Sequence, residues 1–214
     1  MKKIDLIGIG AGGHTKVLID IINDNNKFNI LGLISSKNNI NIINNIDIIG
    51  SDEDLVKFYK KGVRDVFIGI GSIEDTKKNK LIYDNLIKIG FNIISVIHNT
   101  AIISNSASLM SGVKVMAGSI INPETVIGNN CIINTGSIIE HDCCLKDHVQ
   151  IGPGSYVAGN VIIGEGSIIG IGAKIIQGIT IGEYSMVAAG AVVTSNIGDN
   201  KMFAGIPAKE KKTW

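Results

Sequence analysis

The chain of 214 residues is poor in aromatic side chains, cysteine and net charge. Aromatic residues make up 5% of it, which disfavours the stacking surfaces used by proteins that bind single-stranded nucleic acids. The formal net charge of +1 provides no strong field for nucleic acid or an acidic membrane. No apolar run approaches the roughly 18 residues of a membrane-spanning helix. We therefore expect no nucleic acid and no membrane among its partners.

The three cysteines form no CxxC pair and no His/Cys cluster with the spacing of metal ligands, so we expect no metal site. Cys131 and Cys143 occupy a small position of the repeat described below, which indicates buried packing rather than a reactive thiol. Cysteine use of this kind is typical of the reducing cytoplasm. The first residues also lack the cleavage site of a signal peptide, so we expect a cytoplasmic protein.

A six-residue repeat extends from Ala101 to Asn196, and its third position is aliphatic in sixteen consecutive hexads. These third-position residues are Ile103, Leu109, Val115, Ile121, Ile127, Ile133, Ile139, Leu145, Ile151, Val157, Ile163, Ile169, Ile175, Ile181, Val187 and Val193. A period of six excludes an amphipathic α-helix, whose apolar stripe returns every 3.6 residues, and it predicts short strands separated by turns. Stacked coils of such strands form a hexapeptide β-helix with the aliphatic column inside.

The N-terminal residues predict a small α/β domain. Lys3–Gly8 is expected to be a buried strand and Thr15–Asn23 a helix, with a glycine-rich turn between them. A strand, a glycine turn and a helix form a phosphate-binding arrangement, because glycines let the backbone approach a phosphate and the helix N-terminus offers N–H groups. The other elements expected here are strands at Leu31–Ile34, Val66–Ile70 and Asn92–Val96 and a helix at about Asp75–Ile89.

The glycines of this turn leave more than one interpretation open. Gly8, Gly10 and Gly13 match the G-x-G-x-x-G pattern of nicotinamide dinucleotide sites. The next strand, however, ends in Ser35-Ser36, where such a site places an acid that binds the ribose, so a dinucleotide reductase is disfavoured. A tight turn that binds nothing is the remaining alternative for this motif.

The densest polar cluster of the repeat is the stretch from Asn134 to Cys143. His141 follows the inward-facing Ile139 by two residues, so we expect it outside the helix, near a corner. Asp142 can reach it only if the turn bends between them, because successive strand residues point in opposite directions. From the spacing alone, a solvated surface histidine and a functional one are equally open.

The chain as a whole resembles the NeuD/PglD-type sugar acyltransferases. The shared features are the opening Gly-Ala-Gly-Gly-His, the Ile97-His98-Asn99 link to the hexads, the Asn134–Cys143 stretch and the ending Gly205-Ile206-Pro207-Ala208-Lys209. The resemblance implies a Rossmann-like nucleotide- or sugar-binding domain over residues 1–97. It implies a left-handed parallel β-helix acetyltransferase domain with a C-terminal cap over residues 98–214, and a homotrimer with the acetyl-CoA groove between neighbouring helices.

The resemblance also implies roles for individual residues, with His141 as the general base and Asp142 as its support. The implied substrate-binding residues are Gly12, Gly13, His14, Ser35, Ser36, Gly71 and Asn134. The implied cofactor-binding residues are Gln150, Gly159, Ile171, Ala189 and Lys209. Two places depart from the family pattern: Ser35-Ser36 stand where acids are frequent, and Gln150, which cannot carry a proton, stands where a second histidine is common. His148, two residues away, does not replace that histidine.

We expect a cytoplasmic enzyme that moves the acetyl group of acetyl-CoA to the amino group of a nucleotide-linked amino sugar, of the UDP-4-amino-sugar type, in bacterial surface glycan biosynthesis. His141 would take the proton of the acceptor, and a backbone N–H would stabilise the oxyanion. O-acetylation of a sialic acid-type sugar needs the same base and donor and stays an alternative. A β-helix scaffold that binds a sugar nucleotide without turning it over is the alternative outside enzymes.

Overall fold

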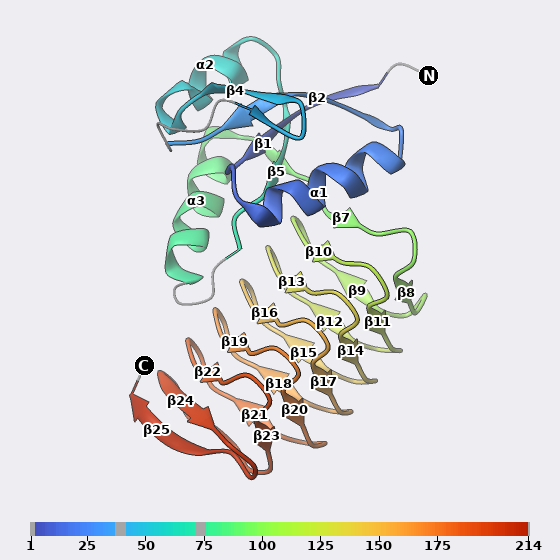
Figure 1. The fold of residues 1–214 in the computed structure, drawn as a ribbon, viewed down its shortest axis with the longest axis vertical. Helices are drawn as coiled ribbons and strands as arrows, with labels where there is room; N and C mark the ends of the chain where they lie inside the picture. The colour runs from blue at the N-terminus through green and yellow to red at the C-terminus, as the bar shows by residue number, and fades with distance from the viewer. Residues whose placement is uncertain (1–2, 37–41, 72–75, 214) are drawn as a thin grey trace. The chain divides into compact units, whose positions relative to one another are not determined.

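The computed structural model describes residues 3–36, 42–71 and 76–213. Residues 212 and 213 are described by their backbone alone. The chain forms two compact units (Figure 1). The first consists of Met1–Ser72 and Leu81–Val96, and the second of Ile73–Lys80 and Ile97–Trp214. Within the described residues, no helix is long and apolar enough to cross a membrane.

The first unit is a small α/β domain built on a twisted sheet. Its elements are β1 (Ile4–Ile9), α1 (Gly13–Asp24), β2 (Phe28–Ile34), β3 (Ile42–Ile43), β4 (Ile46–Gly50), the 3-10 helix η1 (Asp52–Asp54), α2 (Leu55–Lys60), β5 (Asp65–Ile68), the helix α3 (Thr76–Ile89) from Leu81 onward, and β6 (Asn92–Ile93). The first turn of α3, up to Lys80, belongs to the second unit. The strand order is β3-β4-β2-β1-β5-β6, and all pairs are parallel except β3 with β4. Because β1 is central and covered on both faces, its second half is continuously buried.

One expected strand is wrong in its extent. Asn92–Val96 is not a single strand but two short ones, β6 and β7 (Val96–Ile97), which belong to different sheets. Ile94 N–H still donates to the carbonyl of Val66 in the first unit, whereas His98 N–H donates to that of Val115 in the second. The chain therefore changes its hydrogen-bonding partner within four residues. The expected start of α3 at Asp75 lies outside the described residues.

The second unit is a parallel β-helix of two-residue strands. They are β8 (Ile102–Ile103), β9 (Ser108–Leu109), β10 (Lys114–Val115), β11 (Ile120–Ile121), β12 (Val126–Ile127), β13 (Ile132–Ile133), β14 (Ile138–Ile139), β15 (Cys144–Leu145), β16 (Gln150–Ile151), β17 (Tyr156–Val157), β18 (Ile162–Ile163), β19 (Ile168–Ile169), β20 (Lys174–Ile175), β21 (Thr180–Ile181), β22 (Met186–Val187) and β23 (Val192–Val193). From β8 to β20, each strand pairs with the strand three places further on, so the strands form three sheets and one coil contains three hexads. A hairpin of β24 (Lys201–Ala204) and β25 (Lys209–Thr213) ends the largest sheet.

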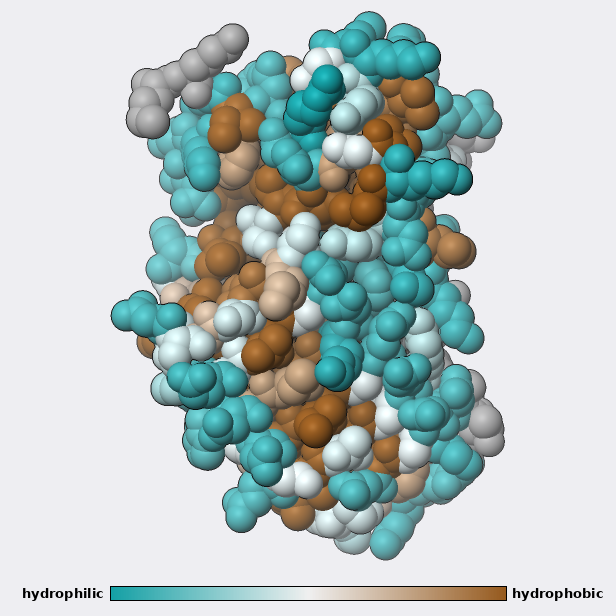
Figure 2. All heavy atoms as spheres, turned by 180° about the vertical axis from the view of Figure 1, so that it is seen from behind, coloured by the Kyte–Doolittle hydropathy of each residue, from teal (hydrophilic) through white to brown (hydrophobic). Residues whose placement is uncertain are grey.

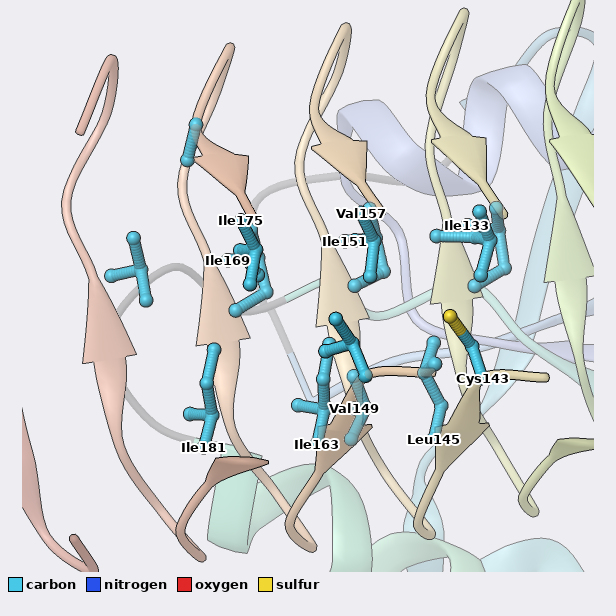
Figure 3. Packing of buried hydrophobic residues seen from close by; sticks show 14 of the residues in the cluster. Ile133, Cys143, Leu145, Val149, Ile151, Val157, Ile163, Ile169, Ile175 and Ile181 are labelled. Carbon is cyan, nitrogen blue, oxygen red and sulfur yellow. The ribbon is translucent and has the colours of Figure 1, made fainter. Parts of the chain in front are cut away.

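The aliphatic third positions line the interior of this helix, as the repeat predicts. Fourteen of the sixteen are buried in one cluster, and Ile103 and Leu109, in the first coil, are partly buried against it. Figure 3 shows Ile133, Ile151 and Ile169 pointing into the space between the sheets, toward Leu145 and Ile163. Burying one such side chain contributes about 1.5–3 kcal/mol. The repeat is thus stabilised by a continuous apolar column.

Small polar residues at the first position of the hexads are buried but hydrogen-bonded, which removes the cost of burying them. Their hydroxyls or thiols donate to a backbone carbonyl fifteen residues later, in the pairs Ser119–Asn134, Thr125–Glu140, Cys131–Lys146, Cys143–Ala158, Ser155–Gly170 and Ser167–Gly182. Burial raises the pKa of the Cys131 thiol to about 12 and also raises the pKa of Cys143. Both cysteines are therefore protonated packing residues, as predicted.

Candidate active site

The predicted general base lies at a corner of the β-helix, in the turn between β14 and β15. We call the turn of Glu140, His141 and Asp142 the His141 corner. Asp142 has a left-handed φ of 59°, and this sharp bend brings its carboxylate back to the ring. Asp142 Oδ2 lies 2.7 Å from His141 Nδ1. Because a carboxylate can only accept, Nδ1 carries the proton and Nε2 of the neutral imidazole keeps a free lone pair.

Backbone contacts hold this corner on both sides. The Thr125 hydroxyl donates to the carbonyl of Glu140 at 2.9 Å. Asp142 N–H donates to the carbonyl of Pro123 at 3.0 Å, and the carbonyl of His141 accepts from Asn160 N–H at 2.9 Å. The two side chains themselves are open to solvent, with 62% of His141 and 58% of Asp142 exposed. The corner thus presents a reachable imidazole on a backbone that is fixed by the coils above and below.

One polar contact of the corner was missed in the sequence. Asn122 Nδ2 donates to Glu140 Oε2 at 3.1 Å and so orients the carboxylate next to the imidazole. The two residues are eighteen apart, which is the length of one coil, so they stack in equivalent turns. This spacing is a signal that could have identified Asn122 together with Thr125, which lies fifteen residues before Glu140.

The next corner of the same coil carries a buried histidine. We call the turn of Lys146, Asp147 and His148 the His148 corner. His148 is 3% exposed, and its Nδ1 lies 3.1 Å from Asn130 Nδ2. Asn130 Oδ1 in turn accepts from Lys114 Nζ. Burial lowers the pKa of the Lys114 ammonium from 10.5 to about 7. Lys114, Asn130 and His148 therefore form a buried chain of polar groups without the solvent access of His141.

Gln150, expected to take the place of the family's second histidine, lies on β16. It immediately precedes the inward-facing Ile151, so its side chain points out of the helix, where it is 8% exposed. β16 belongs to a different sheet from β14, the strand that leads into the His141 corner. Its role toward the cofactor stays a prediction.

Three further predicted residues share a different corner of the helix. Asn134, Ile171 and Ala189 lie in turns that follow β13, β19 and β22, three strands of one sheet. The strand β14 separates Asn134 from His141, so one copy of the chain does not bring these residues together with the base. Lys209, at the start of β25, is exposed. Gly159 alone of the predicted cofactor residues lies directly beside His141.

The predicted substrate residues of the first unit gather at one edge of its sheet. The carboxyl ends of β1, β2 and β5 meet there: Gly10 N–H donates to the carbonyl of Ile34, and Gly69 N–H to that of Ile9. His14 lies against Gly71, because a Cβ atom on Gly71 would be 3.5 Å from His14 Cγ. Ser35 and Ser36 follow β2 at the same edge. In open α/β sheets this edge, beside the central strand, is where ligands bind.

The glycines of the first turn divide into two kinds. Gly10 has a φ of 105°, and a Cβ atom on Gly8 would stand 2.4 Å from the Phe67 ring, so both are needed by the fold. Gly12 and Gly13 are different, since a Cβ atom on either would meet nothing within 4 Å. The Gly12 N–H is itself directed at the Thr15 hydroxyl, 3.2 Å away. The fold therefore leaves open space at the start of α1.

Comparisons with known proteins give this geometry its context. Residues 5–86 match the PglD N-terminal domain family, and residues 124–159 and 160–195 match the bacterial transferase hexapeptide family of six repeats. GDP-perosamine N-acetyltransferase from Caulobacter crescentus, solved as a histidine-to-alanine mutant with CoA and GDP-perosamine, is 33% identical over 97% of both chains, with a TM-score of 0.92. The chain belongs to the PglD-type sugar acetyltransferases. The acetyltransferase domain of PglB from Neisseria gonorrhoeae, solved with acetyl coenzyme A, is 30% identical over 98% of this chain and 100% of that chain, with a TM-score of 0.91.

Membership in the PglD-type family confirms the expected fold class, a small Rossmann-like α/β domain followed by a left-handed parallel β-helix. It also confirms the expected enzyme class, an acetyl-CoA-dependent sugar acetyltransferase. WeeI from Acinetobacter baumannii, 24% identical over 97% of this chain and 100% of its own, has the same fold with a TM-score of 0.79. Within the part of the chain that the structure describes, no three His, Cys, Asp or Glu side chains are grouped to hold a metal ion.

Proposed function

We propose that this protein acetylates the amino group of a nucleotide-linked amino sugar in bacterial surface glycan biosynthesis, with acetyl-CoA as donor and His141 as general base. The observation that carries the proposal is the exposed His141–Asp142 pair, held at 2.7 Å on a fixed corner of the β-helix. A relative of 33% identity that was solved with CoA and GDP-perosamine supports the choice of substrates. We propose the cytoplasm as its compartment, because three free cysteines are typical of reducing surroundings.

The proposed mechanism assigns His141 two proton transfers. As the acceptor nitrogen bonds to the thioester carbonyl carbon, Nε2 takes the proton that the nitrogen must lose. Asp142 keeps the imidazole in the tautomer that can accept and stabilises the imidazolium that results. A backbone N–H group stabilises the oxyanion of the tetrahedral intermediate. The C–S bond then breaks, and the imidazolium returns the proton to the CoA thiolate, so the products are the amide and free CoA.

The test of the reaction is a mass measurement on a panel of nucleotide-linked amino sugars and sialic acids. We expect a gain of one acetyl group on the amine of a nucleotide amino sugar and none on a sialic acid hydroxyl. Acetylation of the sialic acid would favour O-transfer instead. Binding of a sugar nucleotide without acetyl transfer to any acceptor, and without CoA binding, would support the scaffold.

We propose that the nucleotide lies against the Gly12–Gly13 segment at the start of α1. The support is the open space there and the helix N-terminus, whose N–H groups favour a phosphate. Gly12→Val should raise the KM for the acceptor, because the new side chain occupies the space of the phosphate, and leave the Kd for CoA unchanged. Gly10→Ala is the contrasting variant: its φ of 105° strains any side chain, so it should lower Tm. An equal loss of affinity for both ligands in Gly12→Val would mean that the nucleotide binds elsewhere.

We infer that the active protein is a homotrimer. Two sheets of the β-helix carry exposed apolar residues in their outward columns, among them Ile102, Val126, Tyr156 and Ile162, and Figure 2 shows apolar side chains gathered along the repeat. Such a surface favours burial against a second copy. His141 and Gly159 lie at one corner of the β-helix and Asn134, Ile171 and Ala189 at another, and a trimer would bring such corners of neighbouring copies together.

Light scattering tests the assembly, with an expected mass of three times the 22.7 kDa of the chain. Val126→Asp should reduce the mass and the activity together, because it places a charge in the interface. Val56→Asp, the same exchange at an exposed valine of α2 outside the β-helix, is the control. A fully active monomer would contradict the trimer.

A further inference from the structure

Gly159 contacts the imidazole of His141 from the next coil of the β-helix. A Cβ atom at Gly159 would stand 2.7 Å from Cε1 and 2.8 Å from Nε2 of the ring, closer than such atoms approach in proteins. Gly159 has no left-handed φ that would itself require glycine. The bare Cα of Gly159 is therefore needed by the ring of His141 and not by the local backbone.

Other glycines of the repeat serve a different purpose. A Cβ atom on Gly164 would lie 2.6 Å from the backbone nitrogen of Glu183, and one on Gly170 would lie 2.5 Å from that of Ala189. At those positions the close approach is between two coils, so a side chain would disturb the helix itself. At Gly159 the neighbour is the end of a side chain that is 62% exposed and free to swing outward. A substitution there should spare the coil and displace the ring.

The ring is the part that must move, because the backbone around it is held. The carbonyl of Glu140 accepts from the Thr125 hydroxyl, and the carbonyl of His141 accepts from Asn160 N–H. A ring pushed outward by a methyl group at position 159 leaves its place 2.7 Å from the Asp142 carboxylate. The imidazole then loses the hydrogen bond that fixes its tautomer, and Nε2 no longer points toward the acceptor.

We propose that Gly159 is a positioning residue for His141, which makes room for the imidazole in the orientation that directs Nδ1 to Asp142 and Nε2 to the acceptor. The inference rests on the proposed role of His141 as general base. It differs from a contact between Gly159 and the cofactor, which is the role that the family resemblance implies for this residue.

A double-mutant cycle separates these roles. The proteins are wild type, Gly159→Ala, His141→Ala and the double variant, with Gly198→Ala as control, since a Cβ atom on Gly198 meets nothing within 4 Å and its φ is not left-handed. The readouts are kcat, the Kd for CoA and Tm. Gly159→Ala should lower kcat about 10²-fold, because a misplacement of about 1 Å in an active site costs about that much. Its Kd for CoA and its Tm should match those of Gly198→Ala.

The decisive comparison is made without the imidazole. With His141 replaced by alanine, the methyl group at position 159 meets no ring, so the double variant should be no slower than His141→Ala alone. A further loss in the double variant, or a weaker affinity for CoA in both Gly159→Ala proteins, would assign Gly159 to the cofactor. If Gly159→Ala keeps the wild-type kcat while His141→Ala is impaired, the positioning role of Gly159 is wrong and the proposed base is retained. An active His141→Ala protein would overturn the proposed base.

Discussion

Two consecutive corners of one coil carry a histidine each, and the two differ in almost every physical respect. His141 is 62% exposed and bonded to a carboxylate, whereas His148 is 3% exposed and bonded to the amide of Asn130. His141 is the middle residue of its turn, while His148 is the last residue and has a left-handed φ of 62°. The comparison shows that two histidines at consecutive corners can differ in solvent access and in the partner of Nδ1, the two properties on which a general base depends.

The neighbours of each corner explain the difference. Gly166 occupies the position of His148 one coil further on. Its carbonyl accepts a hydrogen bond of 2.6 Å from the hydroxyl of Thr76, at the start of α3. Lys80 also pairs with Glu165 there, at 3.3 Å. On the His141 side, the equivalent position one coil further on is the exposed Asn160. Residues of α3 therefore lie against the turns of the His148 side, whereas the His141 corner is open to solvent.

The largest expected effect contrasts the two histidines directly. His141→Ala should lower kcat by about 10²–10⁴-fold, the usual contribution of a general base, with the fold intact because the side chain is outside the core. His148→Ala should leave kcat nearly unchanged but destabilise the protein by about 1–3 kcal/mol, because it removes a partner of the buried Asn130 amide. Steady-state kinetics and thermal unfolding of both variants make the measurement. A His141→Ala enzyme with more than about a third of wild-type kcat would refute the base.

The second prediction concerns the partner of His141. Asp142→Asn should fold normally, because asparagine tolerates the left-handed φ of 59° at this position. Its amide can donate to Nδ1, which places the proton of the imidazole on Nε2 and removes the acceptor. We expect kcat to fall about 10²-fold or less, the scale of a mispositioned group. Asn130→Asp, the matching exchange in the His148 corner, should affect Tm rather than kcat. Full activity of Asp142→Asn would show that the tautomer is unimportant.

The third prediction compares the two side chains that donate hydrogen bonds to the first carbonyl of each corner. Thr125 and Cys131 are equivalent residues whose side chains donate to the carbonyls of Glu140 and Lys146, at 2.9 and 3.1 Å. Thr125→Val should cost about 1 kcal/mol, the net value of one hydrogen bond. Cys131→Val should cost less, because a thiol is a weak donor. Equal losses of Tm in the two variants, measured at the same protein concentration, would mean that packing and not hydrogen bonding holds the corners.

The last prediction is a pH dependence of stability at Lys114, on β10, whose ammonium donates to Asn130 beside the His148 corner. Burial lowers the pKa of Lys114 to about 7 in the folded protein, whereas an unfolded chain has a lysine pKa of about 10.4. Between these values the unfolded state holds a proton that the folded state has lost, so the Lys114 contribution to the free energy of unfolding rises with pH. The stability of wild type relative to Lys114→Met should therefore increase from about pH 7 to about pH 10.

The control for this pH series is Lys146→Met, at an exposed lysine in the turn of the His148 corner. Its difference in Tm from wild type should not vary over the same range. A constant difference for Lys114→Met as well would mean that the buried amine keeps its proton over this range, as the lysine of the unfolded chain does.

Much of the fold follows from local pattern. The third-position residues from Ile103 to Val193 predict the interior column, because only a strand-and-turn unit of six residues returns an aliphatic side chain to one axis at that period. The alternation of strand and helix likewise predicts β1, α1, β2 and β5. The short strand β4 and the helix α2 were missed, since six or fewer residues carry little periodic signal.

The candidate site could be predicted only in part. The sequence indicates His141 and Asp142 as neighbours near a corner, but their contact depends on the left-handed φ of Asp142, which an aspartate adopts only where the fold requires it. The proximity of Gly159 and Asn122 to this corner arises from the stacking of coils eighteen residues apart. The sequence shows this spacing, but only the stacked coils show that residues eighteen apart are in contact.

The sequence by itself determined the β-helix, the glycine turn before α1 and the position of His141 near a corner, because hydrophobic period and glycine placement act over a few residues. The tertiary structure alone decided which histidine is open, which is buried beside Lys114 and Asn130, and which glycine makes room for a ring. These outcomes depend on atoms fifteen to eighteen residues apart, or in another element such as α3. Burial and hydrogen-bond partners are properties of such neighbours, and local propensity does not contain them.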